Sequence, residues 1–555
     1  MILQKNLLWL LCLWCTVSLP AQSQSGLDAD AITKFLYQHA NDDSPGVAVG
    51  IVMDGRVAYE HYLGYANIEH AVKAGPATRF NIASNAKQFT ALCILQLQMA
   101  GKLKLEDDFR TYLPDFYPDY PGKISISQLL CHTSGIRDVY YLWGLQGKTW
   151  WELFVDNQDA LELLKRQRGF NFEPGTDYLY SNSNYLILTE IVKVLTETDF
   201  DDFAKSTFQA LDMPNSSFLS NFMEVLPHKA SPYGNWNGWK EYPFVTDVHG
   251  DGALFTTLGD QLQWEMMLQK NAGTILSSEM IERSQQPIAG SGTERYGYGL
   301  MFGEYKGKAY AYHHGSTGAY HATFLRFPTE GTAIVVMSNS GGVPTHYLAK
   351  QIADEVLDLE ASEATFPAGP ASVQGGIDPV ASVGTYREVG GNGTIIRIKA
   401  ERDTLVREIY QRDPVKLIKE EEGLYHYANN QALKMAFTKD EAGQVGFTLF
   451  IASQAPAVYR RLPAFHLERY NPQGILGSFF NAETETTVSI AHAGGDEYLI
   501  TKNGRERKAK LVYRDFLRMN SYEINVVRDA SGTVTGLNVD NDRVRNIVFE
   551  KLDKS

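Results

Sequence analysis

A serine and a lysine three positions apart are the first residues in this sequence that suit covalent chemistry. They lie in Ser84-Asn85-Ala86-Lys87, at the start of an apolar pattern that predicts a helix from Ser84 to Met99. Positions i and i+3 share a helix face, so the lysine amine can reach the serine hydroxyl. Burial among neighbours such as Phe80 and Phe89 would lower the lysine pKa from about 10.4 and allow it to accept the serine proton. Taken alone, this spacing more often marks a capped helix with a surface lysine.

A tyrosine and an asparagine form a second candidate group at Tyr180-Ser181-Asn182. They follow the turn Glu173-Pro174-Gly175 and precede a predicted helix over 184–195, so we expect them on a loop at a helix entrance. A phenol can relay a proton when a nearby ammonium lowers its pKa. The asparagine amide can donate to a substrate carbonyl and accept a hydrogen bond from Lys87. In isolation, such a segment is usually a turn with a packed tyrosine.

A third candidate group, His313-His314-Gly315-Ser316, lies just ahead of a predicted strand from Ala322 to Phe327. We expect it on the edge of a sheet, where side chains alternate, so that only one histidine faces a cleft. The glycine lets a substrate backbone approach closely, and the N–H of Ser316 can pair with that of Ser84 as an oxyanion hole. A structural histidine pair is the default interpretation of this motif alone.

Residues 27–358 contain the elements that must position these groups. Along this region the predicted elements change from strands to helices and then back to strands. Two predicted strands, Gly46–Met53 and Arg56–Tyr62, are joined by a hairpin turn at Asp54-Gly55. Helical patterns then dominate until strands return near residue 330, and a helix from about His346 to Leu357 closes the region. Both ends of the region therefore feed one antiparallel sheet that helices cover, which is an α+β fold.

The chain begins with an apolar segment from Leu7 to Leu19 behind the basic residue Lys5. A helix of that length rises only about 20 Å, short of the roughly 30 Å of a hydrocarbon core. Small residues then suit a signal peptidase, so residues 1–23 are predicted to be a signal peptide of an exported, periplasmic or secreted protein. An uncleaved anchor is the alternative. No second segment is long enough to span a membrane, so we expect no stable membrane insertion after signal removal.

The region beyond residue 358 changes to a different composition. Residues 359–378 are rich in Ala, Ser, Gly and Pro and are predicted to be a linker. Short alternating segments follow and repeat, with Gly384-Thr385-Tyr386 opening one unit and Gly477-Ser478-Phe479 another. We expect two small all-β, barrel-like repeats at 379–463 and 468–553.

Composition narrows the classes of partner and cofactor. The chain has 555 residues, 44% of them hydrophobic and 21% charged, as soluble globular proteins do. A net charge of -14 repels phosphate backbones, so nucleic acid is not an expected partner. No metal-ligand spacing or phosphate-binding glycine loop is present, so no cofactor is expected. The two cysteines after the signal, Cys93 and Cys131, are predicted to be buried thiols or one incidental bridge.

Together, the three groups in this order resemble the serine β-lactamase and penicillin-binding-protein-like hydrolases, in their class C-like branch. The segments that carry the resemblance are Thr78–Thr90, Ile126–Gly135, Glu173–Asn182 and Gly250–Thr257. The resemblance covers about residues 30 to 358, with Cys131 where a threonine is more usual. It implies an antiparallel sheet flanked by helices, with a site between the sheet and an all-helical lobe.

The resemblance also implies roles for individual residues. Ser84 would be the nucleophile, Lys87 the base, and Tyr180 the proton relay of acylation and deacylation. The implied substrate-binding residues are Asn182, His313, Gly315 and Ser316. Among these, His313 would bond toward Tyr180 or the substrate, and the backbone amides of Ser84 and Ser316 would form the oxyanion hole.

One departure from the family pattern bears on the substrate. β-Lactamases and DD-peptidases usually carry Lys-Thr-Gly where this chain has His313-His314-Gly315, and histidine is mostly neutral near pH 7. His-x-Gly resembles the motif of D-aminopeptidases and related esterases, and the D-aminopeptidases also carry two β-barrel domains. The sequence therefore predicts an exported serine hydrolase that acts through an acyl-enzyme on amide or ester bonds of small D-amino-acid-like or acyl substrates, with weak or absent β-lactamase activity.

Two alternatives stay open: a β-lactamase or D-Ala-D-Ala peptidase, and a non-catalytic cell-wall or peptide-binding protein on the same fold. The expected partner is a small-molecule or peptide substrate. Three further features are interpreted as structural: His132 and Asp251 as turn residues, and Tyr140-Tyr141-Leu142-Trp143 mainly as packing.

Overall fold

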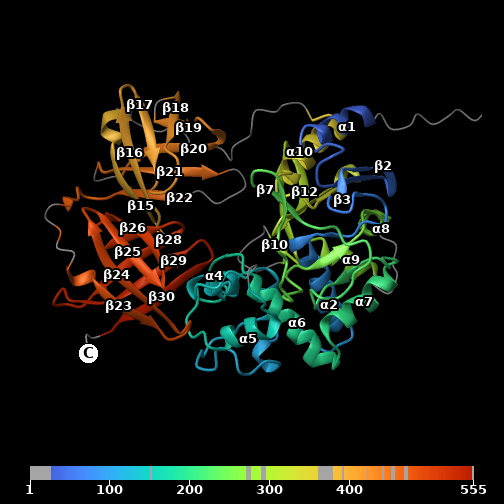
Figure 1. Ribbon diagram of the computed structural model, residues 1–555, viewed down its shortest axis with the longest axis horizontal. Coiled ribbons are helices and arrows are strands. Elements are labelled where there is room, and N and C mark those ends of the chain that lie inside the picture. The colour runs from blue at the N-terminus through green and yellow to red at the C-terminus, as the bar shows by residue number, and fades with distance from the viewer. Residues whose placement is uncertain are drawn as a thin grey trace, which may run out of the picture.

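The computed structural model describes most of the chain after the predicted signal peptide (Figure 1). The described residues are 27–150, 153–270, 277–288, 296–359, 379–389, 393–421, 423–440, 443–451, 457–467, 470 and 473–552. The predicted signal peptide 1–23, and all but one residue of the predicted linker 359–378, lie outside them. Over the described ranges, no helix combines the length and apolar character needed to cross a membrane.

An antiparallel sheet with the strand order β10-β11-β12-β13-β14-β1-β2 is the centre of the first region. Its strands are β1 Val47–Met53, β2 Arg56–Leu63, β10 Tyr296–Gly297, β11 Leu300–Tyr305, β12 Lys308–Thr317, β13 Tyr320–Phe327 and β14 Thr332–Ser338. Strand β1 pairs with β14 from Val47 opposite Ser338 to Met53 opposite Thr332. The two ends of the region therefore meet inside one sheet, which confirms the predicted α+β fold.

Helices cover both faces of this sheet. Helices α1 (Ala29–Tyr37) and α10 (Thr345–Val356) pack on one face with an apolar cluster, and α8 (Leu258–Lys270) packs on the other. Strand β1 reads Val-Ala-Val-Gly-Ile-Val-Met because both of its faces are buried. Gly50 marks the closest approach, since a Cβ there would lie 2.6 Å from Leu262.

A helical lobe lies between the two halves of the sheet in sequence. Its helices are α2 Lys87–Met99, α3 Ile126–Leu130, α4 Val139–Leu145, α5 Asn157–Lys165, α6 Asn182–Thr196 and α7 Phe200–Ala210, with α9 Ser278–Ser284 packed against α2. Helix α2 is buried on nearly all sides and contacts α6, α7 and α9. Its start, where Lys87 lies, is therefore fixed from several directions.

The third motif does not lie on the edge of the sheet, as the sequence suggested. It falls within β12, an interior strand flanked by β11 and β13. The expectation was wrong because residues 296–305, which the sequence analysis assigned to no element, form β10 and β11 outside β12.

The C-terminal region forms two closed eight-strand barrels, as the predicted fold class has it. The first contains β15 Gly384–Val389, β16 Ile395–Glu401, β17 Thr404–Glu408, β18 Val415–Glu421, β19 Leu424–Tyr427, β20 Asn430–Lys439, β21 Val445–Ile451 and β22 Ala457–Arg461. The second contains β23 Gly477–Asn481, β24 Thr486–Gly494, β25 Glu497–Lys502, β26 Arg505–Tyr513, β27 Phe516–Met519, β28 Tyr522–Arg528, β29 Val534–Asn541 and β30 Val544–Lys551. The domain boundaries predicted from sequence stay predictions, although these strands fall within them.

The second barrel packs against the helical lobe beside α4 (Figure 1). Arg137, which is 1% exposed, ion-pairs with Glu483 and donates to the backbone carbonyls of Arg545 and Asn546. In return, Lys502 of the barrel donates to the carbonyl of Gly144. These contacts bring the β29–β30 turn of the barrel to the edge of the cavity that contains Ser84.

Candidate active site

A short 3-10 turn, Ala83–Ala86, presents Ser84 directly ahead of α2. Ala83 has a φ of 49°, in the left-handed region that non-glycine residues rarely adopt. The turn is fixed because Asn81 accepts from the N–H of Ala83, and the Asn85 amide donates to the carbonyls of Ile82 and Ala322. In a 3-10 turn, positions i and i+3 eclipse, so Lys87 lies directly over Ser84.

Lys87 is fully buried and makes three hydrogen bonds. Its amine donates to Ser84 Oγ at 3.2 Å, to Asn182 Oδ1 at 2.8 Å and to the carbonyl of Asp251 at 2.7 Å. The pKa of Lys87 is lowered to about 8, chiefly by burial; Asp251 and Asp138 act to raise it, while Arg543 acts to lower it. When the amine is neutral, Asn182 and Asp251 take its two N–H groups and its lone pair faces Ser84.

Tyr180 completes the group by lying over Lys87. Its ring centroid is 4.9 Å from Lys87 Nζ, and the ring packs against the buried His132 ring, tilted by 37°, at 4.2 Å between centroids. Burial raises the pKa of Tyr180 above its usual range, while Arg543 and the Ser84 hydroxyl act in the opposite direction. The Tyr180 hydroxyl has no ordinary hydrogen bond among the described residues, although Ser84 is near enough to affect its pKa.

Asn182 is the first residue of α6 rather than a loop residue, and Asp138 fixes it there. The buried Asp138 carboxylate accepts from both the backbone N–H and the side-chain amide of Asn182, each at 2.8 Å. These two donated hydrogen bonds fix the amide orientation, so Oδ1 must face Lys87. Asp138 also caps α4, which links the lysine to the wall of the cleft.

His313 and Ser316 reach the same cavity from β12. His313 is buried, and burial lowers its pKa well below its usual value, so its ring is neutral at pH 7. Its Nδ1 bonds the carbonyl of His314 at 2.8 Å and its Nε2 bonds the Tyr296 hydroxyl at 3.1 Å. The family resemblance implied a bond toward Tyr180 or the substrate; the Tyr180 ring centroid lies 6.1 Å from that of His313.

Gly315 packs against the serine turn itself. A Cβ at this position would lie 2.4 Å from the carbonyl oxygen of Ile82 and 2.8 Å from the backbone N of Ser84. Only glycine fits between the strand and the turn, and this close packing brings the Ser84 and Ser316 amides into one cavity. The motif therefore requires glycine for the approach of the protein's own backbone.

Arg543, from the turn between β29 and β30, is a residue of this site that sequence analysis missed, as is Asp138. Its guanidinium lies 4.6 Å from the Tyr180 ring centroid and 3.8 Å from Asp138 Oδ2, and it lines the cavity that contains Ser84. Its backbone carbonyl accepts from the Asn171 amide at 3.2 Å, which anchors the turn to the lobe. No local motif marks this residue, because it lies in the second barrel.

The cavity around Ser84 has a volume of about 360 Å³. Tyr140, Tyr141 and Phe244 form aromatic walls, so Tyr140 and Tyr141 line the cavity, whereas packing was the favoured interpretation over a lip at the substrate site. Asp251 also lines the cavity rather than only forming a turn, and its carboxylate accepts from the Tyr140 hydroxyl at 3.0 Å. Two sequence signals could have indicated this role of Asp251: the glycines on either side of it and the family resemblance of its segment.

His132 keeps the structural role that was expected of it. Its Nδ1 bonds the N–H of Ser181 and the Asn184 amide, each at 3.2 Å, while its ring supports Tyr180. Cys93 and Cys131 are both buried thiols, not a bridge. Within the described residues, no group of three or more metal-ligating side chains is assembled.

Comparisons with known proteins place this geometry in a family. The sequence model of the Beta-lactamase family matches residues 33–357. A D-aminopeptidase of Brucella ovis is 24% identical over 550 residues, covering 94% of this chain and 99% of its own length. A D-aminopeptidase of Gluconobacter oxydans is 26% identical over 349 residues, covering 62% and 63%.

The fold has a counterpart among solved structures. The octameric penicillin-binding protein homologue from Pyrococcus abyssi aligns with a TM-score of 0.55 at 21% identity, covering 78% of this chain and all of that one. At that identity the likeness concerns the fold, whereas the family match spans more than half of the chain. The chain therefore belongs to the β-lactamase family of serine hydrolases.

Proposed function

We propose that this protein hydrolyses amide or ester bonds of small D-amino-acid-like or acyl substrates through an acyl-enzyme on Ser84. The observation that carries the proposal is the Lys87 amine, which is buried, has a lowered pKa and lies 3.2 Å from Ser84 Oγ. An amine in this position can accept the serine proton, which a surface lysine cannot do near neutral pH. The similarity to D-aminopeptidases over nearly the whole chain supports the substrate class.

The reaction proceeds in two matched halves. Ser84 Oγ attacks the carbonyl carbon while its proton passes to Lys87, and the backbone N–H groups of Ser84 and Ser316 stabilise the oxyanion. The phenol of Tyr180 donates a proton to the leaving group and regains one from Lys87. Water then attacks the acyl-enzyme, the same groups move its proton, and the acid and free Ser84 are released.

A carboxylate-bearing substrate is the second candidate, and Arg543 is the observation that favours it. The neutral His313 cannot replace the charge of the usual third-motif lysine, whereas the Arg543 guanidinium brings a positive charge to the same cavity. Arginine pairs with carboxylates through charge-assisted hydrogen bonds. A D-Ala-D-Ala peptidase or β-lactamase activity would use this charge, whereas a free substrate amine would be repelled by it.

A substrate panel separates these possibilities. The full mature chain is assayed with D-amino-acid p-nitroanilides, p-nitrophenyl esters, a D-Ala-D-Ala peptide and nitrocefin, with Ser84→Ala as the blank. The proposal expects p-nitroanilide or ester turnover that Ser84→Ala abolishes, and the second candidate expects preference for the peptide or nitrocefin. Identical rates for wild type and Ser84→Ala on every substrate would favour a non-catalytic binding protein instead.

The cellular location is part of the proposal. The apolar leader predicted at residues 1–23 supports export to the periplasm or medium. Fractionation of expressing cells tests this, since a protein that stays in the cytoplasm with its leader uncleaved would contradict it.

A further inference from the structure

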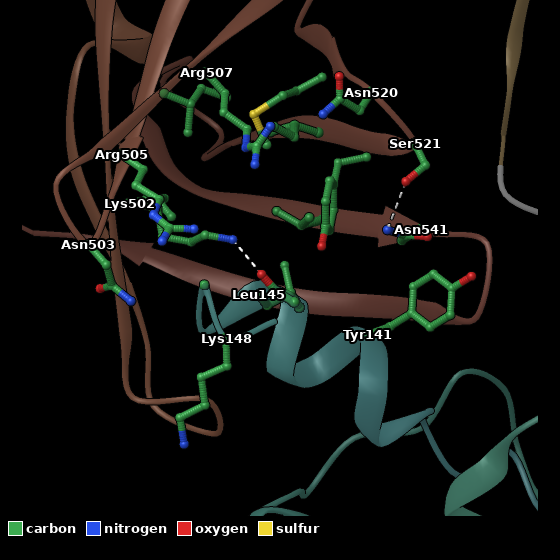
Figure 2. A pocket seen from close by; sticks show the side chains of 18 of the residues that line it. Tyr141, Leu145, Lys148, Lys502, Asn503, Arg505, Arg507, Asn520, Ser521 and Asn541 are labelled. Carbon is green, nitrogen blue, oxygen red and sulfur yellow. Dashed lines mark hydrogen bonds between the residues drawn. The ribbon is translucent and has the colours of Figure 1, made fainter. Parts of the chain in front are cut away.

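A second cavity, of about 650 Å³, lies between the second barrel and α4 (Figure 2). It is larger than the cavity around Ser84, and both volumes fall in the range of small-molecule sites. Eight-strand barrels are just wide enough to be filled by side chains or to hold one small ligand. The residues that line this cavity therefore determine which small molecule it can bind.

The floor of the cavity is apolar. Its apolar lining residues include Val488, Ile490, Ile500, Ile524, Leu537 and Phe549, which come from five strands of the barrel. Such a floor gains from burying an apolar group of the ligand, at about 25 cal/mol for each Å² removed from water. An aliphatic or aromatic portion of a ligand therefore belongs in the barrel interior.

The rim is cationic. Lys502, Arg505 and Arg507 reach the cavity from the β25–β26 hairpin, and Lys148 follows α4 (Figure 2). None of the described residues that line the cavity is acidic, in a chain whose net charge is -14. Over the described part of the chain, neither Arg505 nor Arg507 has an ion pair or side-chain hydrogen bond.

The strand pattern explains why these cations gather on one side. Side chains alternate along β26, so Arg505 and Arg507 share the cavity face while Lys508 and Lys510 do not line it. Lys508 and Lys510 instead pair with Glu497 at 3.5 Å and Asp496 at 3.0 Å. The lysines outside the cavity have acidic partners, and the arginines at its rim have none among the described residues.

Lys502 adds to the concentration of positive charge. Its amine donates to the carbonyl of Gly144, and its pKa is lowered to about 8 by burial and by Arg507. A bound anion would stabilise the charged form of Lys502. The cavity thus combines uncompensated positive charge at the mouth with an apolar interior.

We propose that this cavity binds an anionic amphiphile, a molecule with one carboxylate head and an unbranched acyl chain. The carboxylate pairs with Arg505 and Arg507 at the rim, and the chain extends over the apolar floor of the barrel. This inference is independent of the reaction at Ser84. Tyr140 and Tyr141 line both cavities, so a bound amphiphile would contact the wall of the catalytic cleft.

Binding of dodecanoate to the full mature chain, measured by isothermal titration calorimetry, tests the proposal. We expect saturable one-to-one binding with a Kd of about 10 μM, and affinity that rises about fourfold with each methylene from hexanoate upward. Dodecanol, which lacks the charge, should bind about tenfold more weakly or worse. Absence of saturable dodecanoate binding at about 1 mM would overturn the proposal.

A matched pair of variants locates the site. Arg505→Gln/Arg507→Gln should weaken dodecanoate binding at least tenfold, because both charge-assisted bonds are lost. Lys508→Gln/Lys510→Gln removes the same charge from the other face of the same strand and should change Kd by less than about twofold. Equal weakening by both pairs would show unspecific attraction and would contradict the proposed site. Circular dichroism of each variant shows that the barrel remains folded.

Discussion

The Lys87 amine lies among groups that act on its pKa in opposite directions. Burial and the Arg543 guanidinium lower the pKa, whereas the carboxylates of Asp251 and Asp138 raise it, and the outcome is a pKa of about 8. A base of this pKa is partly neutral at neutral pH, and its conjugate acid remains strong enough to return the proton. Burial raises the pKa of Tyr180 beside it, so the phenol stays protonated and, in the proposed reaction, can donate a proton to the leaving group.

The first prediction is a pH profile. If neutral Lys87 is the base, kcat/KM should rise with pH through about 8, because the free enzyme gains activity as the ammonium loses its proton. Lys87→Met should lower kcat/KM by about 10³-fold at pH 8. The measurement is kcat/KM for the best substrate of the panel between pH 5 and 10, in buffers of constant ionic strength. A profile that is flat through pH 8 would contradict the assignment.

The second prediction concerns Arg543. Because its charge lowers the pKa of Lys87, Arg543→Gln should raise that pKa and move the rising limb of the profile to higher pH. Arg545→Gln is the matched control: this residue comes from the same barrel but pairs with Asp177 at 3.3 Å. Its profile should keep the wild-type position. A limb that stays in place in Arg543→Gln, or moves equally in both variants, would show that Arg543 does not act on the base.

Local sequence was enough to predict part of the site. Ser84 and Lys87 share one turn, and Tyr180 and Asn182 share one helix entrance, so short spacings carried the signal. The structure brings these four together, with Lys87 bonded to Asn182 across 95 positions of sequence. Arg543 and Asp138 escaped prediction because their roles arise from tertiary packing between a barrel turn and a helix cap, which no local pattern encodes.

Strand β12 and the turn Ala83–Ala86 act as one unit at the scale of elements. The strand crosses the turn so closely that there is no room for a side chain at Gly315. The Asn85 amide of the turn also donates a hydrogen bond to the Ala322 carbonyl of β13. Ser84 is therefore positioned by the sheet as well as by α2. This arrangement places a strained residue, Ala83, where the surrounding structure can maintain it.

The third prediction tests this contact. Gly315→Ala would place a Cβ 2.8 Å from the Ser84 nitrogen, so the turn must shift, and kcat/KM should fall by about 10²-fold or more. Gly341→Ala is the control, because its nearest neighbour would lie at an ordinary 3.6 Å. Steady-state kinetics and thermal melting are measured for both. Full activity in Gly315→Ala would mean that the contact does not position the nucleophile.

The periodicity of apolar residues predicted where most strands and helices lie, but not which strands are neighbours in the sheet. The strands Gly46–Met53 and Ala322–Phe327 and the helix beginning near His346 follow from apolar patterns, and the structure has β1, β13 and α10 at these places. The interior position of β12 did not follow, because β10 has only two residues and β11 is mostly half-buried. Short strands of that kind carry little periodic signal.

In the whole molecule, the second barrel forms part of the cavity around Ser84. Its β29–β30 turn contributes Arg543, and Arg137 of the lobe is almost entirely enclosed by barrel and lobe atoms. Glu483 neutralises Arg137 and also accepts from the N–H groups of Arg168 and Gly169. The Glu483 carboxylate thus makes several of the contacts between the second barrel and the helical lobe.

The fourth prediction measures that connection. Glu483→Ala leaves the buried Arg137 charge without its partner and should reduce the free energy of unfolding by about 3 kcal/mol. The neighbouring Glu485 is 65% exposed and lies 3.9 Å from Arg166, so Glu485→Ala should change it by no more than about 0.5 kcal/mol. Urea unfolding followed by fluorescence gives both values. Equal stability of the two variants would show that the interface does not depend on the buried pair.

Detection of the covalent intermediate tests most sharply whether Ser84 forms an acyl-enzyme. The protein is mixed with the best D-amino-acid or acyl ester, quenched in acid within the first turnovers, and examined by intact and peptide mass spectrometry. If Ser84 forms the acyl-enzyme, we expect a mass increase equal to the acyl group, located on the peptide that contains Ser84 and absent from Ser84→Ala. Steady turnover with no adduct, or an adduct on another residue, would contradict it.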